Sequence, residues 1–264
     1  MGGQAFSGKA VLITGASSGI GAELARQLAA AGAQLTLTAR RADRLEALAN
    51  ELAAKGGKKP IVIACDLQEA DAGEKIAAAL AAEGVELDHL VNNAGFGVFG
   101  DAIECDRDEQ VGIVDVNVRA LTDLSLRFAD QLVRNKGGLL NVGSVAGFLP
   151  GPGMAVYYAS KAYVISLTEA LRAELAPRGV RVTVLCPGPV PTEFQARAGV
   201  GSGHDTTLLN VSAADVAQQA YRGLMANKRA VLPGLGIKIV PFALRFFPRG
   251  FILAATSRFQ RQRR

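Results

Sequence analysis

A tyrosine and a lysine stand four residues apart in Tyr157-Tyr158-Ala159-Ser160-Lys161, where a predicted helix begins that continues to about Pro177. Side chains four apart share one helix face, so Tyr157 and Lys161 are expected to point into the same space. A phenol with a pKa of about 10 is a poor acid or base at neutral pH, but a neighbouring ammonium lowers that pKa. The pair predicts a general acid–base centre, although such pairs also arise by chance, and Tyr158 is expected to be structural.

A glycine-rich segment from Thr14 to Gly21 joins a strand-like apolar run to an Ala/Leu-rich helical stretch. Glycines there let the backbone approach a pyrophosphate, and the free N–H groups and dipole of the helix N-terminus attract the anion. The alternative is a Gly/Ser loop without a ligand, but the position directly after the first strand favours a dinucleotide site. The expected contacts come from Gly15, Ser17, Ser18, Gly19, Ile20 and Gly21.

Two arginines follow the second predicted strand, in Thr38-Ala39-Arg40-Arg41. In a nucleotide-binding protein of this class, the side chains at this strand end meet the ribose 2′ position and so select NAD or NADP. No carboxylate is available there for a 2′-hydroxyl, whereas Arg40 and Arg41 can neutralise a 2′-phosphate. The alternative is that both are solvated charges at a helix start, but cations are unfavourable at that end of the helix dipole. The sequence therefore predicts NADP(H).

Seven short β-rich runs must position these residues, and helix-length segments separate them. Their near-continuous Val/Ile/Leu content predicts strands covered on both faces, and the strand–helix alternation predicts a parallel sheet. The expected fold is a single α/β domain with a doubly wound parallel sheet, the Rossmann fold. The predicted strands are Ala10–Thr14, Leu35–Ala39, Ile61–Cys65, His89–Val91, Leu139–Val142, Val180–Leu185 and Ala230–Leu232.

Taken together, these residues resemble the short-chain dehydrogenases/reductases, from about Gly8 to Leu232. The spacings of 27 residues from Asn117 to Ser144 and 13 from Ser144 to Tyr157 are also typical of that family. The matching elements are the Thr14–Gly21 loop, Asp66, Asn92-Asn93-Ala94-Gly95, Asn117, Ser144, Tyr157 with Lys161, and Pro187-Gly188 with Thr192.

The resemblance implies a catalytic set of Asn117, Ser144, Tyr157 and Lys161. Tyr157 would be the general acid in reduction, Ser144 would hold the substrate carbonyl, and Lys161 would lower the Tyr157 pKa and bind the nicotinamide ribose. Asn117 would interrupt its helix and hold a water of a proton relay. The further cofactor contacts that the resemblance implies are Asp66, Leu67, Asn93, Ala94, Gly95, Pro187, Gly188, Val190 and Thr192. Taken singly, Ser144, Asn117 and Thr192 also have ordinary structural readings as turn, helix and cap residues.

The residue inventory argues against other catalytic schemes. The sequence holds two histidines, His89 in a predicted strand and His204 in a predicted loop from Pro187 to Asn210, so neither a three-histidine metal site nor a Ser-His-Asp triad is expected. A halohydrin-dehalogenating relative is opposed by Lys161 and the phosphate loop. A cofactor-binding sensor or scaffold without turnover remains the alternative from another class.

The charge distribution and the cysteine content bear on nucleic-acid binding and on the cellular compartment. The residues from Leu235 to Arg264 hold seven Lys/Arg and no Asp/Glu, which leaves 22 basic and 24 acidic residues elsewhere, so no basic stripe predicts nucleic-acid binding. Three widely spaced cysteines and the absence of a signal-like segment predict a reducing, cytoplasmic location. We expect a homodimer or homotetramer, as in many relatives.

The chain divides into an expected domain over residues 1–234 and a basic, aromatic extension over residues 235–264. The phenylalanines of this extension either pack on the domain or a subunit interface, or support weak peripheral membrane contact. A lipophilic ketone or oxoacyl substrate is suggested by apolar residues near the motifs, namely Phe96, Phe99, Phe148, Leu149 and Met154.

Overall fold

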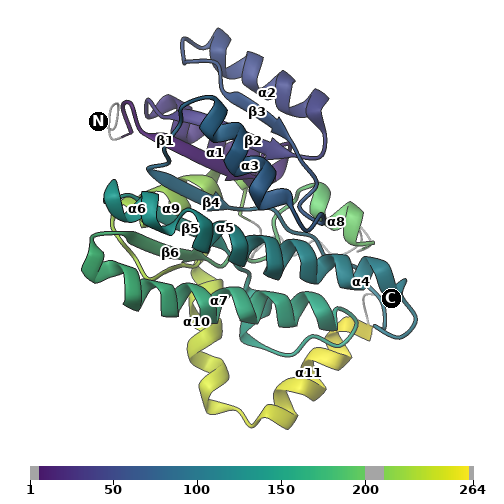
Figure 1. The fold of residues 1–264 in the computed structure, drawn as a ribbon. Coiled ribbons are helices and arrows are strands. Elements are labelled where there is room, and N and C mark those ends of the chain that lie inside the picture. Colours follow the sequence, from purple (N-terminus) through teal and green to yellow (C-terminus); the bar gives the residue numbers. More distant parts are fainter. Residues whose placement is uncertain (1–5, 200–210, 262–264) are drawn as a thin grey trace.

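The computed structural model describes residues 6–199 and 211–261 and contains a seven-stranded, all-parallel sheet in the order β3-β2-β1-β4-β5-β6-β7 (Figure 1). Each strand lies within one residue of its predicted bounds at either end, and the predicted doubly wound α/β fold is confirmed. The strands are β1 Ala10–Thr14, β2 Gln34–Ala39, β3 Ile61–Ala64, β4 His89–Asn92, β5 Gly138–Val142, β6 Arg181–Leu185 and β7 Ala230–Val231.

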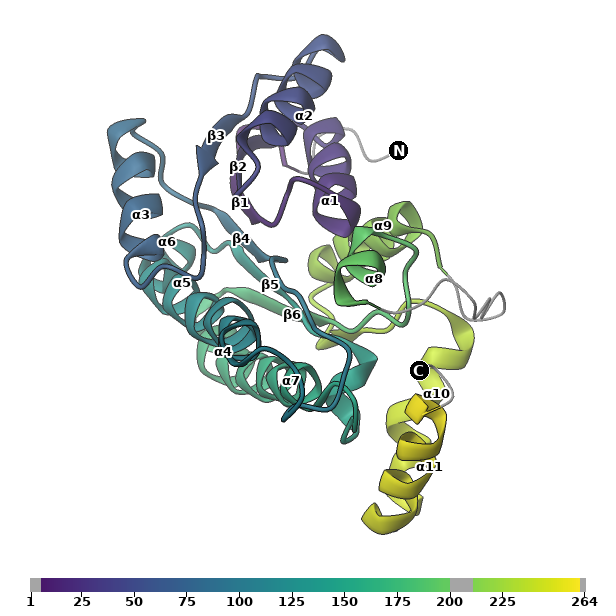
Figure 2. The same cartoon turned by 90° about the vertical axis from the view of Figure 1, so that its right-hand side faces the viewer.

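Helices cover both faces of the sheet (Figure 2). One face carries α1 Gly19–Ala30, α2 Ala42–Ala54 and α9 Ala213–Met225. The other carries α3 Ala72–Ala82, α4 Arg107–Val114, the π-helical turn Asp115–Ala120, α5 Leu121–Arg127, α6 Ala129–Arg134 and α7 Ala155–Leu175. The remaining helices are the 3₁₀ turns Val145–Phe148, Ala176–Arg178 and Leu244–Phe246, with α8 Glu193–Ala198, α10 Leu235–Ala243 and α11 Arg249–Arg261.

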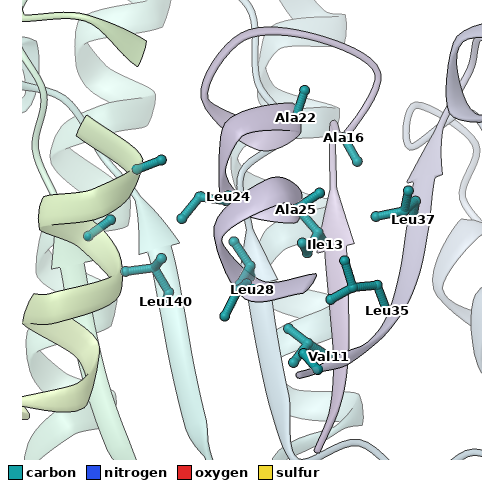
Figure 3. Packing of buried hydrophobic residues seen from close by; sticks show 14 of the residues in the cluster. Val11, Ile13, Ala16, Ala22, Leu24, Ala25, Leu28, Leu35, Leu37 and Leu140 are labelled. Carbon is teal, nitrogen blue, oxygen red and sulfur yellow. The ribbon is translucent and has the colours of Figure 1, made fainter. Parts of the chain in front are cut away.

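Alternation within the apolar strands explains why both faces are covered. Val11 and Ile13 of β1 belong to the apolar cluster beneath α1, whereas Leu12 between them belongs to the cluster on the opposite face. Successive strand residues point to opposite faces, so a continuous apolar run needs helices on both sides. Figure 3 shows the first of these clusters, with Ala25 and Leu28 of α1 lying over β1.

The chain reverses its direction across the sheet at β1, and this fixes where a ligand binds. β1 pairs with β2 on one side and β4 on the other, with Val11 in register with both Leu35 and His89. The loops after β1 and β4 therefore diverge to opposite faces and leave a crevice at the carboxyl ends of the strands. The glycine-rich segment lies after β1, directly beside this crevice.

The prediction of a loop from Pro187 to Asn210 is wrong at residues Glu193–Ala198, which form the helix α8. Thr192 is the N-cap residue, Glu193 places an acidic side chain in the first turn, and Gly199 ends the helix at a φ of +73°. These are ordinary start and stop signals of a helix. His204 lies outside the described residues.

The expected extension after Gly234 is helical, and it consists of α10, the 3₁₀ turn Leu244–Phe246 and α11. Over the described residues, the structure has no helix long and apolar enough to cross a membrane. Pro241 lies inside α10.

His89 in β4 is buried, with 2% of its surface exposed, and its ring lies 4.6 Å from the Phe6 ring. Burial, with help from the positive charge of Arg181, lowers the pKa of this imidazole to about 4. The folded protein therefore holds His89 neutral at pH values where the unfolded chain, with a histidine pKa of about 6.5, binds a proton.

Because the unfolded chain binds the extra proton, the free energy of unfolding is expected to fall as the pH drops from 6.5 towards 4. The His89 contribution amounts to about 3 kcal/mol between neutral pH and pH 4. Urea unfolding of the wild type and His89→Leu across this range measures it. The variant is expected to show the shallower pH dependence, and equal slopes would contradict the buried neutral imidazole.

Candidate active site

A cavity of about 920 Å³ lies at the carboxyl ends of the strands and gathers most of the predicted site residues. Three catalytic candidates, Ser144, Tyr157 and Lys161, line it. The predicted cofactor residues that line it are Gly15, Ser17, Ser18, Gly19, Ile20, Arg40, Arg41, Asp66, Leu67, Asn93, Ala94, Gly95, Pro187, Gly188, Val190 and Thr192. Gly21 and Asn117 are not among its lining residues.

The loop after β1 closes tightly because its glycines accept positions that other residues avoid. Gly15 has a φ of +64°, and a Cβ there would lie 2.8 Å from the Ala94 Cα atom. Asn93 Nδ2 donates to the carbonyl oxygens of Thr14 at 2.9 Å and Gly15 at 3.1 Å. Gly21 has a structural role in the same packing, since its missing side chain leaves room for the Asn93 amide.

The start of α1 fits a bound phosphate. Gly19 has a φ of +54°, no acidic residue occurs in the first turn, and the Ser18 side chain makes no capping hydrogen bond. The first backbone N–H groups of a helix have no partner within the helix, so they are available to an anion. The Cβ position of Gly19 lies 3.1 Å from Thr192 Cγ2, which shows how closely the segment after β6 approaches the loop.

Three guanidinium groups border the same cavity. Arg40 NH1 lies 4.0 Å from Asp66 Oδ2, and Arg41 NH2 donates to Ser17 Oγ at 3.2 Å and Glu193 Oε2 at 2.8 Å. Arg197 of α8 lies over the Phe96 ring, 4.1 Å from its centroid. Burial, followed by repulsion from Arg40, lowers the Arg197 pKa.

Such a concentration of positive charge favours an anionic ligand over a neutral one. Together with the unpartnered backbone N–H groups at the start of α1, these side chains make the cavity fit a nicotinamide dinucleotide. Glu193, Phe194 and Arg197 were missed because α8 was predicted as loop. The Thr192 cap and Gly199 were the signals that could have found it.

Tyr157 and Lys161 lie in the first turns of α7, which begins at Ala155. Lys161 Nζ lies 5.9 Å from the Tyr157 ring centroid and donates to the Val142 carbonyl oxygen at 2.8 Å. The Tyr157 ring also lies 5.3 Å from the Phe194 ring of α8. Tyr157 therefore brings α7 into contact with α8 at the cavity.

The pKa of Tyr157 differs from the expectation. We predicted that Lys161 lowers it, but burial raises the pKa of this phenol to about 12, and hydrogen bonding to Ser144 opposes the rise only in part. Burial likewise lowers the pKa of Lys161 to about 8. In both groups the loss of solvent is the largest cause of the shift, because burial disfavours the charged phenolate and the charged ammonium alike.

Ser144 lies two residues beyond the end of β5 and is the N-cap of the 3₁₀ turn Val145–Phe148, and its Oγ accepts a hydrogen bond from the Ala146 N–H at 3.1 Å. This local bond fixes the hydroxyl at the strand end, and Ser144 remains 8% exposed beside the cavity. Its role as a turn residue and its place beside Tyr157 are therefore compatible.

Asn117 lies behind the cavity wall, in the π-helical turn Asp115–Ala120, with no exposed surface. Its side chain accepts from the Phe96 N–H at 3.1 Å and donates to the Phe96 carbonyl at 3.0 Å and to Ser160 Oγ at 2.9 Å. Ser160 Oγ in turn donates to the Tyr157 carbonyl at 2.7 Å. Asn117 thus ties the segment after β4 to the helix that carries Tyr157.

The predicted apolar residues divide into two groups. Phe96, Leu149 and Met154 line the cavity, whereas Phe99 and Phe148 are not among its lining residues. Ile237 of α10 and Thr256 of α11 also border the cavity, so the C-terminal segment completes one wall. Metal ligands are not grouped anywhere in the described residues.

Comparison with known proteins gives matches over most of the chain. The family model described as short chain dehydrogenase matches residues 9–201. The sulfoacetaldehyde reductase of Chromohalobacter salexigens is 38% identical over 220 residues, which cover 80% of this chain and 86% of that protein.

Two solved structures show the same fold. The short-chain dehydrogenase of Sphingobium yanoikuyae in complex with NADPH has a TM-score of 0.82 and 32% identity, with 94% of this chain and 95% of that chain covered. A short chain dehydrogenase/reductase of Burkholderia phymatum in complex with NAD has a TM-score of 0.79 and 28% identity, with 92% and 97% covered. The protein belongs to the short-chain dehydrogenase/reductase family of oxidoreductases.

Proposed function

We propose that the protein is an NADP(H)-dependent oxidoreductase that interconverts a carbonyl compound and a secondary alcohol, with Tyr157 as the general acid and base. One observation carries this proposal: Tyr157, Ser144 and Lys161 line the same cavity as the phosphate loop and the arginine pair. A proton donor and a site for a nicotinamide nucleotide would therefore share one cavity.

In carbonyl reduction, each of these residues has a separate role. The bound nicotinamide supplies the hydride. Ser144 Oγ donates a hydrogen bond to the substrate carbonyl oxygen, and Tyr157 Oη gives its proton to the same oxygen. The raised Tyr157 pKa of about 12 keeps that proton in place at neutral pH before substrate binds.

Lys161 acts after the proton has left. Its ammonium would stabilise the phenolate, and its Nζ atom would hold the nicotinamide ribose. A pKa lowered to about 8 also makes Lys161 able to pass a proton at mildly alkaline pH. Asn117 would support a proton relay through the hydrogen bonds by which it positions Phe96 and Ser160 of α7.

The NADP(H) preference rests on Arg40 and Arg41, since the comparison structures bind NADPH in one case and NAD in the other. Arg40 is half exposed at the cavity edge and holds Asp66 only at 4.0 Å, so it is available to a 2′-phosphate. Arg197 adds a third positive charge to the same cavity.

A lipophilic ketone or oxoacyl compound suits the lining near Tyr157. Leu149, Met154, Phe194 and Ile237 contribute apolar surface there, and burial of apolar substrate groups against them stabilises the complex. A relative with 38% identity is named as a sulfoacetaldehyde reductase, so the proposal of a larger, lipophilic substrate for this protein rests on its own cavity lining. We also propose a cytoplasmic homodimer or homotetramer.

The second candidate is a cofactor-binding sensor or scaffold without turnover. It shares the dinucleotide site, so nucleotide binding alone cannot distinguish the two. The presence of Ser144, Tyr157 and Lys161 at one cavity favours the enzyme.

Oxidation of NADPH and NADH against aliphatic, aromatic and acyl-thioester carbonyl compounds tests the proposal. We expect turnover with NADPH and one of the more lipophilic carbonyl compounds. Tight NADPH binding without turnover on any carbonyl or alcohol of the panel would favour the sensor instead.

A further inference from the structure

The residues after Gly234 form two helices joined by a turn, and this pair stands away from the sheet (Figures 1 and 2). We call residues 235–261 the C-terminal hairpin. Among the described residues, every phenylalanine that is largely exposed lies in it. The exposed fractions of its large apolar side chains are 63% for Ile239, 64% for Phe242, 71% for Phe246, 50% for Phe247, 59% for Phe251 and 45% for Leu253.

The aromatic rings of this surface form pairs rather than isolated contacts. The centroids of Phe242 and Phe246 lie 5.2 Å apart, and those of Phe247 and Phe251 lie 5.3 Å apart in a stacked arrangement. Single exposed apolar residues are ordinary on a protein surface, but neighbouring aromatic pairs form a patch that marks an interaction site.

Other side chains attach the hairpin to the domain. Ile237 and Thr256 are 3% and 7% exposed and border the cavity. Gly188 has no Cβ, and Ile237 Cδ1 occupies the place where one would lie. The hairpin is therefore attached to the domain by buried side chains, whereas its phenylalanines remain exposed and available to a partner.

The charge around these rings has a single sign. From Val216 to the C-terminus the sequence holds no Asp or Glu. Lys238, Arg249 and Arg258 are exposed on the two helices, beside the apolar side chains. A second copy of this hairpin would bring like charges together, which opposes tail-to-tail pairing.

We propose that the C-terminal hairpin is a peripheral binding site for an anionic lipid surface. Its phenylalanines would enter the boundary between headgroups and acyl chains, while Lys238, Arg249 and Arg258 contact lipid phosphates. The aromatic pairs account for the apolar part of the attraction, and the absence of acidic residues accounts for its charge. The hairpin lies on the membrane and does not span it.

The C-terminal hairpin connects the exposed aromatic surface to the catalytic cavity. Ile237 of α10 and Thr256 of α11 line the cavity on one side, and the exposed phenylalanines lie in the same two helices and in the turn that joins them. Lipid contact therefore places the cavity wall next to the membrane surface, where lipophilic molecules concentrate. The binding itself is independent of the proposed catalytic function.

Sedimentation of the full chain with vesicles tests the proposal. Vesicles of equal parts phosphatidylglycerol and phosphatidylcholine are compared with vesicles of phosphatidylcholine alone, at low and high salt. We expect the protein to sediment with the anionic vesicles and to be released by salt, because screening weakens surface attraction.

Point variants are preferable to truncation, because truncation would remove Ile237 and Thr256 from the cavity wall. Phe246→Ser combined with Phe247→Ser is expected to weaken binding at least tenfold, with Ile103→Ser, at a site 96% exposed elsewhere, as the matched control. Arg249→Glu and Arg258→Glu are each expected to weaken it at least about fivefold, since each cation near an anionic surface contributes roughly that factor. Arg107→Glu on α4, whose side chain is 88% exposed, is the control for charge.

The thermal transition and NADPH affinity show whether each variant is folded, and the arginine variants provide an independent test if the phenylalanine pair is unstable. Equal sedimentation with both vesicle types, no salt effect, or hairpin variants that behave like their controls would each overturn the proposal. Light scattering without lipid gives one more decisive result. A lower oligomer mass in the phenylalanine variant would show that this surface joins copies of the chain instead.

Discussion

Tyr157→Phe is expected to lower the turnover number for carbonyl reduction by about 10²- to 10⁴-fold, which is the usual contribution of a positioned acid or base. The substitution removes the proton donor and leaves the ring, whose contact with Phe194 at 5.3 Å can persist. Affinity for NADPH should therefore stay close to that of the wild type. Steady-state NADPH oxidation measures the loss of turnover, and fluorescence titration measures the affinity.

Tyr158→Phe is the matched control, since it removes the same hydroxyl from the neighbouring residue. Tyr158 stands three residues from Lys161, and its ring packs against Gly151, a contact that the phenylalanine ring retains. We expect the Tyr158 variant to remain active. The opposite pattern, an active Tyr157 variant and an inactive Tyr158 variant, would show that our assignment of the proton donor to Tyr157 is wrong.

The fold was predictable because its strands carry their signal locally. Runs such as Ala10–Thr14 are apolar on both faces, and a parallel strand buried on both faces produces that pattern whatever its neighbours are. The gathering of Ser144, Asn93 and Gly15 at one cavity was predictable for a related reason. Each follows a strand, and the carboxyl ends of parallel strands lie at the same edge of the sheet.

The electrostatics of the site could not be predicted from residue spacing. The four-residue interval places Lys161 near Tyr157, but the Tyr157 pKa depends on how much solvent the fold removes around the phenol. Phe194, which reaches the ring from 37 positions along the chain, belongs to a helix that the sequence analysis predicted as loop. Long-range packing of this kind has no periodic signal.

The contribution of the C-terminal segment to the cavity was hidden for the same reason. The sequence shows that this segment is rich in phenylalanine and in basic residues. It does not show that Ile237 packs where Gly188 lacks a side chain. A close approach between a glycine and a distant isoleucine depends on the arrangement of β6 and α10 in space. The sequence predicts the elements, whereas their mutual packing selects which side chains meet.

Arg40→Asp is expected to weaken NADPH binding by about 10- to 150-fold, the range for losing a hydrogen bond to a charged group of roughly 1.5–3 kcal/mol. The new carboxylate would also repel the 2′-phosphate, and it would lie near Asp66, which Arg40 faces at 4.0 Å. NADH has a 2′-hydroxyl that a carboxylate can accept from, so its affinity should stay the same or rise. Fluorescence titration with both nucleotides measures the change in preference.

Arg40 is the better position to test than Arg41, because Arg41 already donates to Glu193 at 2.8 Å and must exchange that partner for a phosphate. Arg44→Asp makes the same charge change on α2, at a residue that is not among those lining the cavity. It therefore controls for the long-range electrostatic effect of the charge change. Its effect on NADPH affinity should be several times smaller, since exposed charges that do not touch the ligand are screened by salt. If both variants lost the same amount of NADPH affinity, the effect of Arg40 would be one of net charge and not of contact with the 2′-phosphate. Equal affinities of the unmutated protein for NADPH and NADH would refute the NADP(H) assignment.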